Sequence, residues 1–315
     1  MTLVVGTDEA GYGPNLGPLV VAASAWRLAA PADGAEEVFA NLAAGTWNAA
    51  PGPLWADSKT IYRGAHGLAA LERGVHAGLL LAGMTAVDGW QALATALGAS
   101  ASEQPATPDW APLASLRLPC AATPESCGAA AGAARTALDA AGVALVHVAA
   151  RAIYPAEFNR SLDAGLNKSD ILSQATLDLA ATVLDRIGPD DTVVWCDRHG
   201  GRKSYAGLVG RHFMAPLVQP LEETATRSAY IVPAAQLRIE FSVGGEARLP
   251  VAIASMTAKY VRELAMQAFN GFWSGRVAGL APTAGYPVDA RRWHDEAAAA
   301  ITTAGIPLDA VWRRV

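Results

Sequence analysis

Two neighbouring acids end the first apolar segment of the chain. The run Leu3–Val5 predicts a buried strand, and Asp8 and Glu9 follow it, ahead of a loop rich in glycine and proline. Adjacent side chains on a strand point to opposite faces, so both acids reach one site only if the chain turns just after them. Paired carboxylates at such a point suit hard cations such as Mg²⁺. A solvated Asp-Glu turn is the alternative.

Two more acids lie in patterned segments farther along the chain. Asp197 ends the apolar run 192–196, and Glu263 lies in a segment with helical periodicity. Taken alone, Asp197 also fits a turn cap. Glu263 alone also fits a solvated helix charge, paired with Lys259 four residues before it.

The chain resembles a known family in seven blocks that occur in the same order along the sequence. They are Asp8–Gly13 with Gly17–Pro18, Asp57–Lys59, Ile171–Leu177, Val193–Asp197, Ala252–Glu263, Gly285–Pro287 and Trp312–Arg314. The first block, Asp-Glu-Ala-Gly-Tyr-Gly, is similar to the Asp-Glu-Ala-Gly-Arg-Gly signature of the type 2 ribonucleases H (ribonuclease HII). The blocks cover a minority of the residues but are specific in type and order.

The resemblance implies a fold and an activity. The fold class is α/β, a ribonuclease H-like mixed β-sheet flanked by helices, with a C-terminal helical segment and an Ala/Pro-rich insertion. The activity is hydrolysis of the phosphodiester at ribonucleotides in RNA–DNA hybrids or duplexes, leaving a 3′-hydroxyl and a 5′-phosphate. Crowded carboxylates repel one another unless cations neutralise them. Two divalent ions, Mg²⁺ or Mn²⁺, held about 3.5–4 Å apart, would do so and clamp the phosphate.

The resemblance also assigns roles to residues of this chain. Asp8, Glu9, Asp197 and Glu263 are expected to be the catalytic acids and metal ligands. The expected substrate-binding residues are Gly11, Tyr12, Gly13, Lys59, Lys168, Arg198, Arg202, Lys203 and Tyr286. Arg198, Arg202 and Lys203 also stand out because they share a basic, glycine-containing loop suited to phosphates. That loop equally fits a plain solvated segment, and His199 within it is a weak candidate for protonating the leaving group.

Two positions depart from the family pattern. Glu263 replaces an aspartate, and its extra methylene predicts a shifted metal position with altered metal preference. Tyr12 replaces the arginine of a loop that reads the 2′-hydroxyl in the family, the group that distinguishes RNA from DNA. Since Gly11 and Gly13 are retained, the backbone part of that reading is expected to persist.

Composition and pattern define the organisation. The 315 residues are 52% hydrophobic, enough for a full core, and we expect a single domain over 1–315. Strands are predicted at 19–25, 143–153, 192–196 and 239–243, and helices at 66–83, 167–187, 252–272 and 289–303. Residues 97–133, with five prolines, predict an insertion or flexible flap, and residues 289–315 a helical tail.

Charge and cysteine usage bound the partners. The net charge of −5 disfavours a broad basic surface of the kind that binds nucleic acid strongly, although it permits a local positive channel. Three cysteines without ligand spacing, and no long uncharged apolar run, predict a cytoplasmic protein that does not bind membranes. We expect a nucleic-acid partner and a monomer without an obligate protein partner. A nuclease for another structured or single-stranded nucleic acid, or a non-catalytic relative, remains the alternative.

Overall fold

A seven-stranded mixed sheet organises the computed structural model, which describes residues 1–45, 48, 52–63, 67–84, 87–98, 107–188 and 190–314. Its strands are β1 (Thr2–Ala10), β2 (Leu19–Leu28), β3 (Val143–Ile153), β4 (Asp191–Asp197), β5 (Gln219–Glu223), β6 (Arg227–Val232) and β7 (Leu237–Ser242). The predicted fold class, a mixed sheet flanked by helices, is confirmed.

The order of the strands sets the position of the acids. The sheet runs β3-β2-β1-β4-β7-β6-β5. The three central strands β1, β4 and β7 are parallel, whereas the remaining neighbours pair antiparallel. Parallel neighbours end at the same edge of a sheet, so side chains that follow β1, β4 and β7 must converge there.

Helices cover both faces of the sheet. Those of eight or more residues are α1 (Ala35–Ala43), α3 (Gly67–Leu81), α5 (Pro124–Ala140), α6 (Pro155–Asp163), α7 (Lys168–Ile187), α9 (Leu249–Ser274) and α10 (Pro287–Thr303). The shorter ones are α2 (Ser58–Ile61), α4 (Trp90–Ala96), α8 (Ala206–His212) and α11 (Leu308–Val311). The 3₁₀ helices within the described residues are η1 (Ala32–Gly34), η4 (Pro108–Ser115), η5 (Pro233–Ala235) and η6 (Gly245–Ala247).

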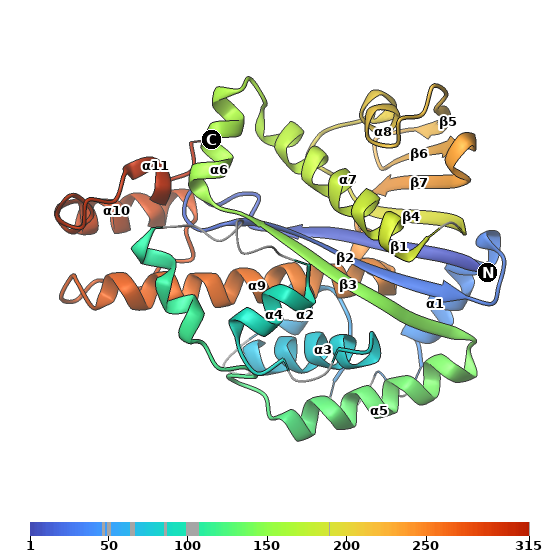
Figure 1. Cartoon of the computed structure of the whole chain (residues 1–315), viewed down its shortest axis with the longest axis horizontal. Coiled ribbons are helices and arrows are strands. Elements are labelled where there is room, and N and C mark those ends of the chain that lie inside the picture. Colours follow the sequence, from blue (N-terminus) through green and yellow to red (C-terminus); the bar gives the residue numbers. More distant parts are fainter. Residues whose placement is uncertain are drawn as a thin grey trace.

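Alternation along the central strand divides the core into two layers. Val4 faces the larger apolar cluster, to which α1, α3, α5 and α9 contribute, whereas Leu3 and Val5 face a second cluster with α7 and α8. Figure 1 shows α7 across one face of the sheet, with α9, α3 and α5 on the other. None of the helices in the described ranges is both long enough and apolar enough to cross a membrane.

The long helix α9 approaches the sheet backbone directly. A Cβ on Gly6 of β1 would lie 2.3 Å from the carbonyl carbon of Pro250, so only glycine fits there. Beside this contact, the Ser24 hydroxyl donates to the Pro250 carbonyl at 2.7 Å. The close approach fixes α9 relative to β1 and therefore relative to Asp8 and Glu9.

The predicted strands and helices are found, with one correction at α7. The helix predicted from residue 167 begins at Lys168, and the Asn167 side chain is its cap, which accepts from the Asp170 N–H at 3.0 Å. Asp170 completes a capping box by accepting from the Asn167 N–H at 3.3 Å. An amide side chain thus occupies the position just before the first helical residue.

The described part of segment 97–133 is folded against the rest of the chain. Trp110 of η4 is buried in the larger cluster, and α5 begins inside the segment and packs against α3. The buried Glu72 of α3 accepts hydrogen bonds of 2.6–2.8 Å from three successive N–H groups of residues 120–122. Residues 99–106 lie outside the described residues.

The C-terminal helices return to the sheet end that carries the acids. Figure 1 shows α10 and α11 beyond one end of the sheet, with α11 beside α6. After α11 the chain runs next to the glycine loop, where Leu16 and Trp312 form an isolated bridge. The predicted helical tail therefore forms part of the wall around the first block of acids.

We expect Gly6→Ala to lower the free energy of unfolding by about 3 kcal/mol, because the added methyl overlaps the Pro250 backbone. Urea denaturation followed by tryptophan fluorescence measures this. Gly128→Ala is the matched control. Gly128 is exposed on α5 with nothing near its absent Cβ, so alanine there should leave stability unchanged or raise it slightly. Equal stability of both variants would show that α9 does not press on β1 as described.

Candidate active site

Three acids meet at the edge where β1 and β4 end. Asp8, Glu9 and Asp197 each place a carboxylate oxygen within 4.8 Å of the others. The strand continues through Ala10 before Gly11 turns the chain with φ +86°. Both neighbouring acids therefore converge while still on the strand, and the turn falls at Gly11, as the glycines of the loop predict.

Glu246 is a fourth acid at this place, and the sequence analysis missed it. It belongs to η6, which follows β7, and its side chain is hydrogen-bonded to Asp197. The Gly245 N–H donates to the same carboxylate at 2.9 Å, and a Cβ on Gly245 would lie 3.1 Å from the Asp197 Cα. The signal was present as an acid three residues beyond a predicted strand, but its value depended on knowing that β7 lies beside β4.

The crowding of these acids raises their pKa values. Desolvation and then Asp197 raise the pKa of Asp8 to about 7, partly offset by hydrogen bonding from Ser255. Desolvation, and then Asp8 and Asp197, raise the pKa of Glu9 well above its usual value. Desolvation raises the pKa of Asp197 to about 6, with Glu246 adding to the rise. Nearby cations would lower all three.

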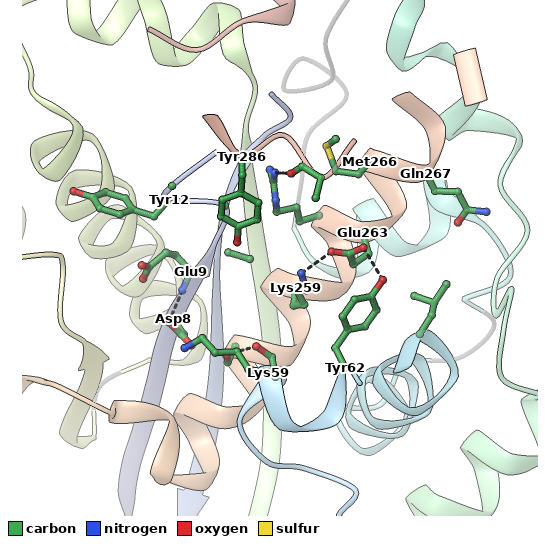
Figure 2. A pocket seen from close by; sticks show the side chains of 18 of the residues that line it. Asp8, Glu9, Tyr12, Lys59, Tyr62, Lys259, Glu263, Met266, Gln267 and Tyr286 are labelled. Carbon is green, nitrogen blue, oxygen red and sulfur yellow. Dashed lines mark hydrogen bonds and ion pairs between the residues drawn. The ribbon is translucent and has the colours of Figure 1, made fainter. Parts of the chain in front are cut away.

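Glu263 does not join this group. One of its oxygens lies 2.6 Å from the Lys259 Nζ, and the other accepts from the Tyr62 hydroxyl at 2.8 Å. Figure 2 shows Glu263 on α9 across the pocket from Glu9, facing Lys259 and Tyr62. The helix places residues four apart side by side, and that local pairing holds Glu263. The geometry does not support its expected role as a metal ligand, and the metal preference inferred from its extra methylene loses its basis.

The acids lie at the base of a cavity of about 510 Å³ that the glycine loop overhangs. Gly11, Tyr12, Gly13 and Tyr286 all line it, and Figure 2 shows Tyr286 over the opening beside Tyr12. Tyr286 is 58% exposed, and a Cβ on Gly13 would lie 3.5 Å from its ring. These four residues are therefore brought together as expected.

Two buried arginines hold the glycine loop in place. Arg262 of α9 donates to the carbonyls of Leu16, at 3.1 Å, and Pro18. Arg313 donates to the carbonyls of Gly11, at 2.6 Å, and Pro14. A carbonyl group turned away from solvent needs such a donor, so the loop conformation depends on both side chains. Arg262 also donates to the Ala284 carbonyl, at 3.0 Å, so its guanidinium group is fully engaged in this role.

Lys59 and Lys168 stand at the edges of the site. Lys59 follows the Asp57 cap of α2, and its Nζ lies 3.5 Å from Glu246, with its side chain 80% exposed. Lys168 opens α7 and places its Nζ 4.4 Å from the centre of the Tyr12 ring. Lys59 lines the cavity itself, and Lys168 is positioned against one of its walls.

The arginines of the basic loop after β4 bond to other protein groups and not to the cavity. Arg198 is buried and donates to the carbonyls of Arg202, at 2.9 Å, and of Thr224 and Ala225. Arg202 pairs with Asp170 at the start of α7. Lys203 is exposed but does not line the cavity. The expected phosphate contacts of Arg198 and Arg202 thus give way to bonds that shape the loop.

His199 is also internal. It is 2% exposed, packs against Tyr205 and Phe241, and has Nδ1 3.0 Å from the Ser173 hydroxyl. Burial lowers the pKa of His199 to about 3, which keeps the ring neutral. His199 does not line the cavity that holds the acids, so the structure gives no support to its role as a proton donor.

The acid group has the chemistry of a site for hard divalent cations. All its donors are carboxylate oxygens, which Mg²⁺ and Mn²⁺ prefer, and burial, followed by repulsion from neighbouring acids, raises the pKa values of Asp8 and Glu9. Lys59 is the cation paired with the group, through Glu246. Asp8, Glu9 and Asp197 are therefore the residues that fit such ions, and Glu246 lies beside Asp197 at the edge of the group.

No model of a known protein family matches the sequence, and no curated protein is significantly similar to it. Solved structures of ribonucleases do align with the structure of this protein over nearly the whole chain. Bst-RNase HIII in complex with Mn²⁺ aligns with a TM-score of 0.47 at 14% identity, over 100% of this chain and 66% of that one. The chain thus spans just under two thirds of that protein.

Two further structures cover similar shares of this chain. RNase HII of Archaeoglobus fulgidus, in complex with PCNA, aligns at 14% identity and TM-score 0.43, over 98% of this chain and 93% of that one. Ribonuclease H2 of Pyrococcus horikoshii OT3 aligns at 14% identity with a TM-score of 0.46, over 98% of this chain and 92% of that one. At this distance their activities do not transfer, and function must follow from this chain's own site.

We expect Asp8→Asn to raise the free energy of unfolding of the metal-free protein by about 1–2 kcal/mol above pH 7, because it removes one repelling charge. The native pKa of Asp8, about 7 against a usual 3.8, means that the folded protein binds this proton more tightly. Asp8 ionisation therefore costs stability progressively as the pH rises from about 4 through about 7. Thermal unfolding in a chelator at several pH values measures the difference. Asp33→Asn, at a 93% exposed side chain, is the control, and equal curves for wild type and Asp8→Asn would contradict the account.

Proposed function

We propose that this protein is a metal-dependent nuclease that hydrolyses the phosphodiester at ribonucleotides in RNA–DNA hybrids or duplexes. One observation carries the proposal, namely the convergence of Asp8, Glu9 and Asp197 within 4.8 Å at the base of an open cavity. Carboxylates crowded in this way repel one another and lower the stability of the fold. A bound divalent cation would neutralise this repulsion. In this reaction water attacks the phosphorus, the bond from phosphorus to the 3′-oxygen breaks, and protonation of that oxygen leaves a 3′-hydroxyl and a 5′-phosphate.

Asp8, Glu9, Asp197 and Glu246 would hold the ions. Two bound divalent cations would supply an activated water and neutralise the charge that develops on the leaving oxygen. Among the protein groups, the Gly245 N–H orients Asp197, and the Glu9 N–H orients Asp8 at 2.7 Å. Lys59 reaches over Glu246 and is free enough to contact a phosphate oxygen as well.

The glycine loop supports selection of a ribose. Gly11 and Gly13 expose backbone next to the acids, and the arginine contacts make the loop rigid before substrate arrives. A rigid polar site that pairs a hydroxyl rejects a substrate lacking it, because its own groups are then left unpaired. Tyr286, exposed above the loop, suits contact with the neighbouring sugar.

A cleavage panel tests the proposal. RNA–DNA hybrid, a DNA duplex with one ribonucleotide, double-stranded RNA and single-stranded DNA would each be incubated with Mg²⁺ and with Mn²⁺. We expect cleavage of the first two substrates, dependent on the metal. Cleavage of single-stranded DNA or double-stranded RNA alone would replace this function with a nuclease of other specificity, and no cleavage with tight binding would indicate a non-catalytic relative.

We expect Glu246→Gln to reduce the cleavage rate at least about a hundredfold, because it removes a ligand of the metal group. Glu263→Gln serves as the comparison on the same cavity, and we expect less than about a tenfold change since Glu263 pairs with Lys259 instead. Single-turnover rates with saturating metal separate the two variants. A loss at Glu263→Gln as deep as that at Glu246→Gln would return Glu263 to the metal site.

Gly13→Ala tests ribose reading without disturbing the fold. Its Cβ makes only ordinary contact with the Tyr286 ring, whereas a Cβ on Gly11 would lie 2.6 Å from the Pro18 carbonyl oxygen at a positive φ. We expect Gly13→Ala to unfold like wild type but to cleave the single-ribonucleotide duplex about tenfold or more slowly, since the methyl enters the space above the acids. An unchanged rate would remove the loop from substrate recognition.

A further inference from the structure

One side of the cavity, which we call the arm, extends along α9 away from the acids. Lys259, Glu263 and Gln267 line it from α9, and their spacing of four residues puts them on one face of the helix. Tyr62, just after α2, forms the facing wall. Figure 2 shows Gln267 farther along α9 from Asp8 and Glu9 than Glu263 is.

The charges of this arm cancel within it. The Lys259 Nζ lies 2.6 Å from one oxygen of Glu263 and 4.8 Å from the centre of the Tyr62 ring, and the Tyr62 hydroxyl donates to the other oxygen. Desolvation and this bond raise the pKa of Tyr62 to about 12, so the hydroxyl remains a donor. The wall is therefore neutral and ordered before any ligand binds, unlike the negative group at the other end of the cavity.

Gln267 is the polar group in the arm that remains available. It is exposed, and within the described ranges its side-chain amide has no hydrogen-bond partner. The next amide along the helix, Asn270, is occupied in both directions by Thr283. Leu68 adds an apolar surface near the Tyr62 side of the cavity. A neutral aromatic and apolar wall with one free amide suits a planar neutral group that has a hydrogen-bonding edge.

We infer that this arm holds one nucleobase of the bound strand beside the scissile phosphate, with Gln267 reading the edge of the base and Tyr62 packing against it. This inference rests on the proposed nuclease function and adds a preference for base identity to the selection of ribose. Phosphates are poorly suited to the arm because the Lys259 charge is already taken by Glu263. A glutamine amide, with donor and acceptor, is well matched to a base edge.

Binding without cleavage tests the inference. In an Asp8→Asn background with Mg²⁺, the affinities of fluorescent DNA duplexes carrying one ribonucleotide would be measured while the base at each flanking position is varied. We expect a preference of about tenfold at one position, reduced below about twofold by Gln267→Ala. Tyr62→Ala should weaken the preferred duplex about tenfold, and Tyr62→Phe should restore most of that affinity. Gln219→Ala, at an exposed glutamine of edge strand β5, is the matched control and should change nothing.

The possible outcomes distinguish a failure of the base-recognition inference from a failure of the proposed nuclease function. A parent protein that binds every duplex equally well overturns the inference and leaves the nuclease function intact. So does a base preference that survives Gln267→Ala, or one that Gln219→Ala also removes. A parent that binds none of the duplexes overturns the proposed function and the inference together.

Discussion

Repulsion between carboxylates at the ends of neighbouring strands is the constraint on which the rest of the structure depends. Asp8, Glu9 and Asp197 converge because β1 and β4 are parallel and paired, and the backbone cannot relax them apart without breaking the sheet. The raised pKa values record the cost of this arrangement. The fold keeps this cluster in place although the charges repel one another. Because only bound cations would offset that repulsion, the cluster indicates a functional site.

Much of the remaining chain fixes the position of α9 and of the glycine loop, which surround that cluster. Gly6 lets α9 rest on the backbone of β1, and α9 carries Arg262 into the glycine loop. Arg313 reaches the same loop from the C-terminal tail, so the first and last segments of the chain are interlocked beside the acids. These guanidinium groups satisfy carbonyls that would otherwise be buried without donors. The loop is consequently shaped in advance for a ligand that approaches the acids from above.

The sequence predicted local features well and failed where an inference needed the neighbouring strand. The strands ending at the acids and the helices α3, α7, α9 and α10 followed from apolar patterning, and three of the four grouped acids followed from their places after strands. Glu246 was missed because its position depends on β7 lying beside β4. The contacts of Glu263 and Arg198 could not be predicted from the family pattern, because local partners, Lys259 and the carbonyls of a nearby turn, hold these side chains. Helix α5 was not predicted, although Thr123 and Pro124 form a helix start.

The central claim is that the acids at the ends of β1, β4 and β7 form a centre for divalent cations. The most direct measurement is the anomalous scattering of Mn²⁺ in crystals of the protein grown with that ion. The account predicts a peak within coordination distance of Asp8, Glu9 and Asp197, with Glu246 close enough to be a ligand directly or through water. Ordered Mn²⁺ held instead by Glu263, or no ordered Mn²⁺ at the acid group under saturating metal, would contradict it.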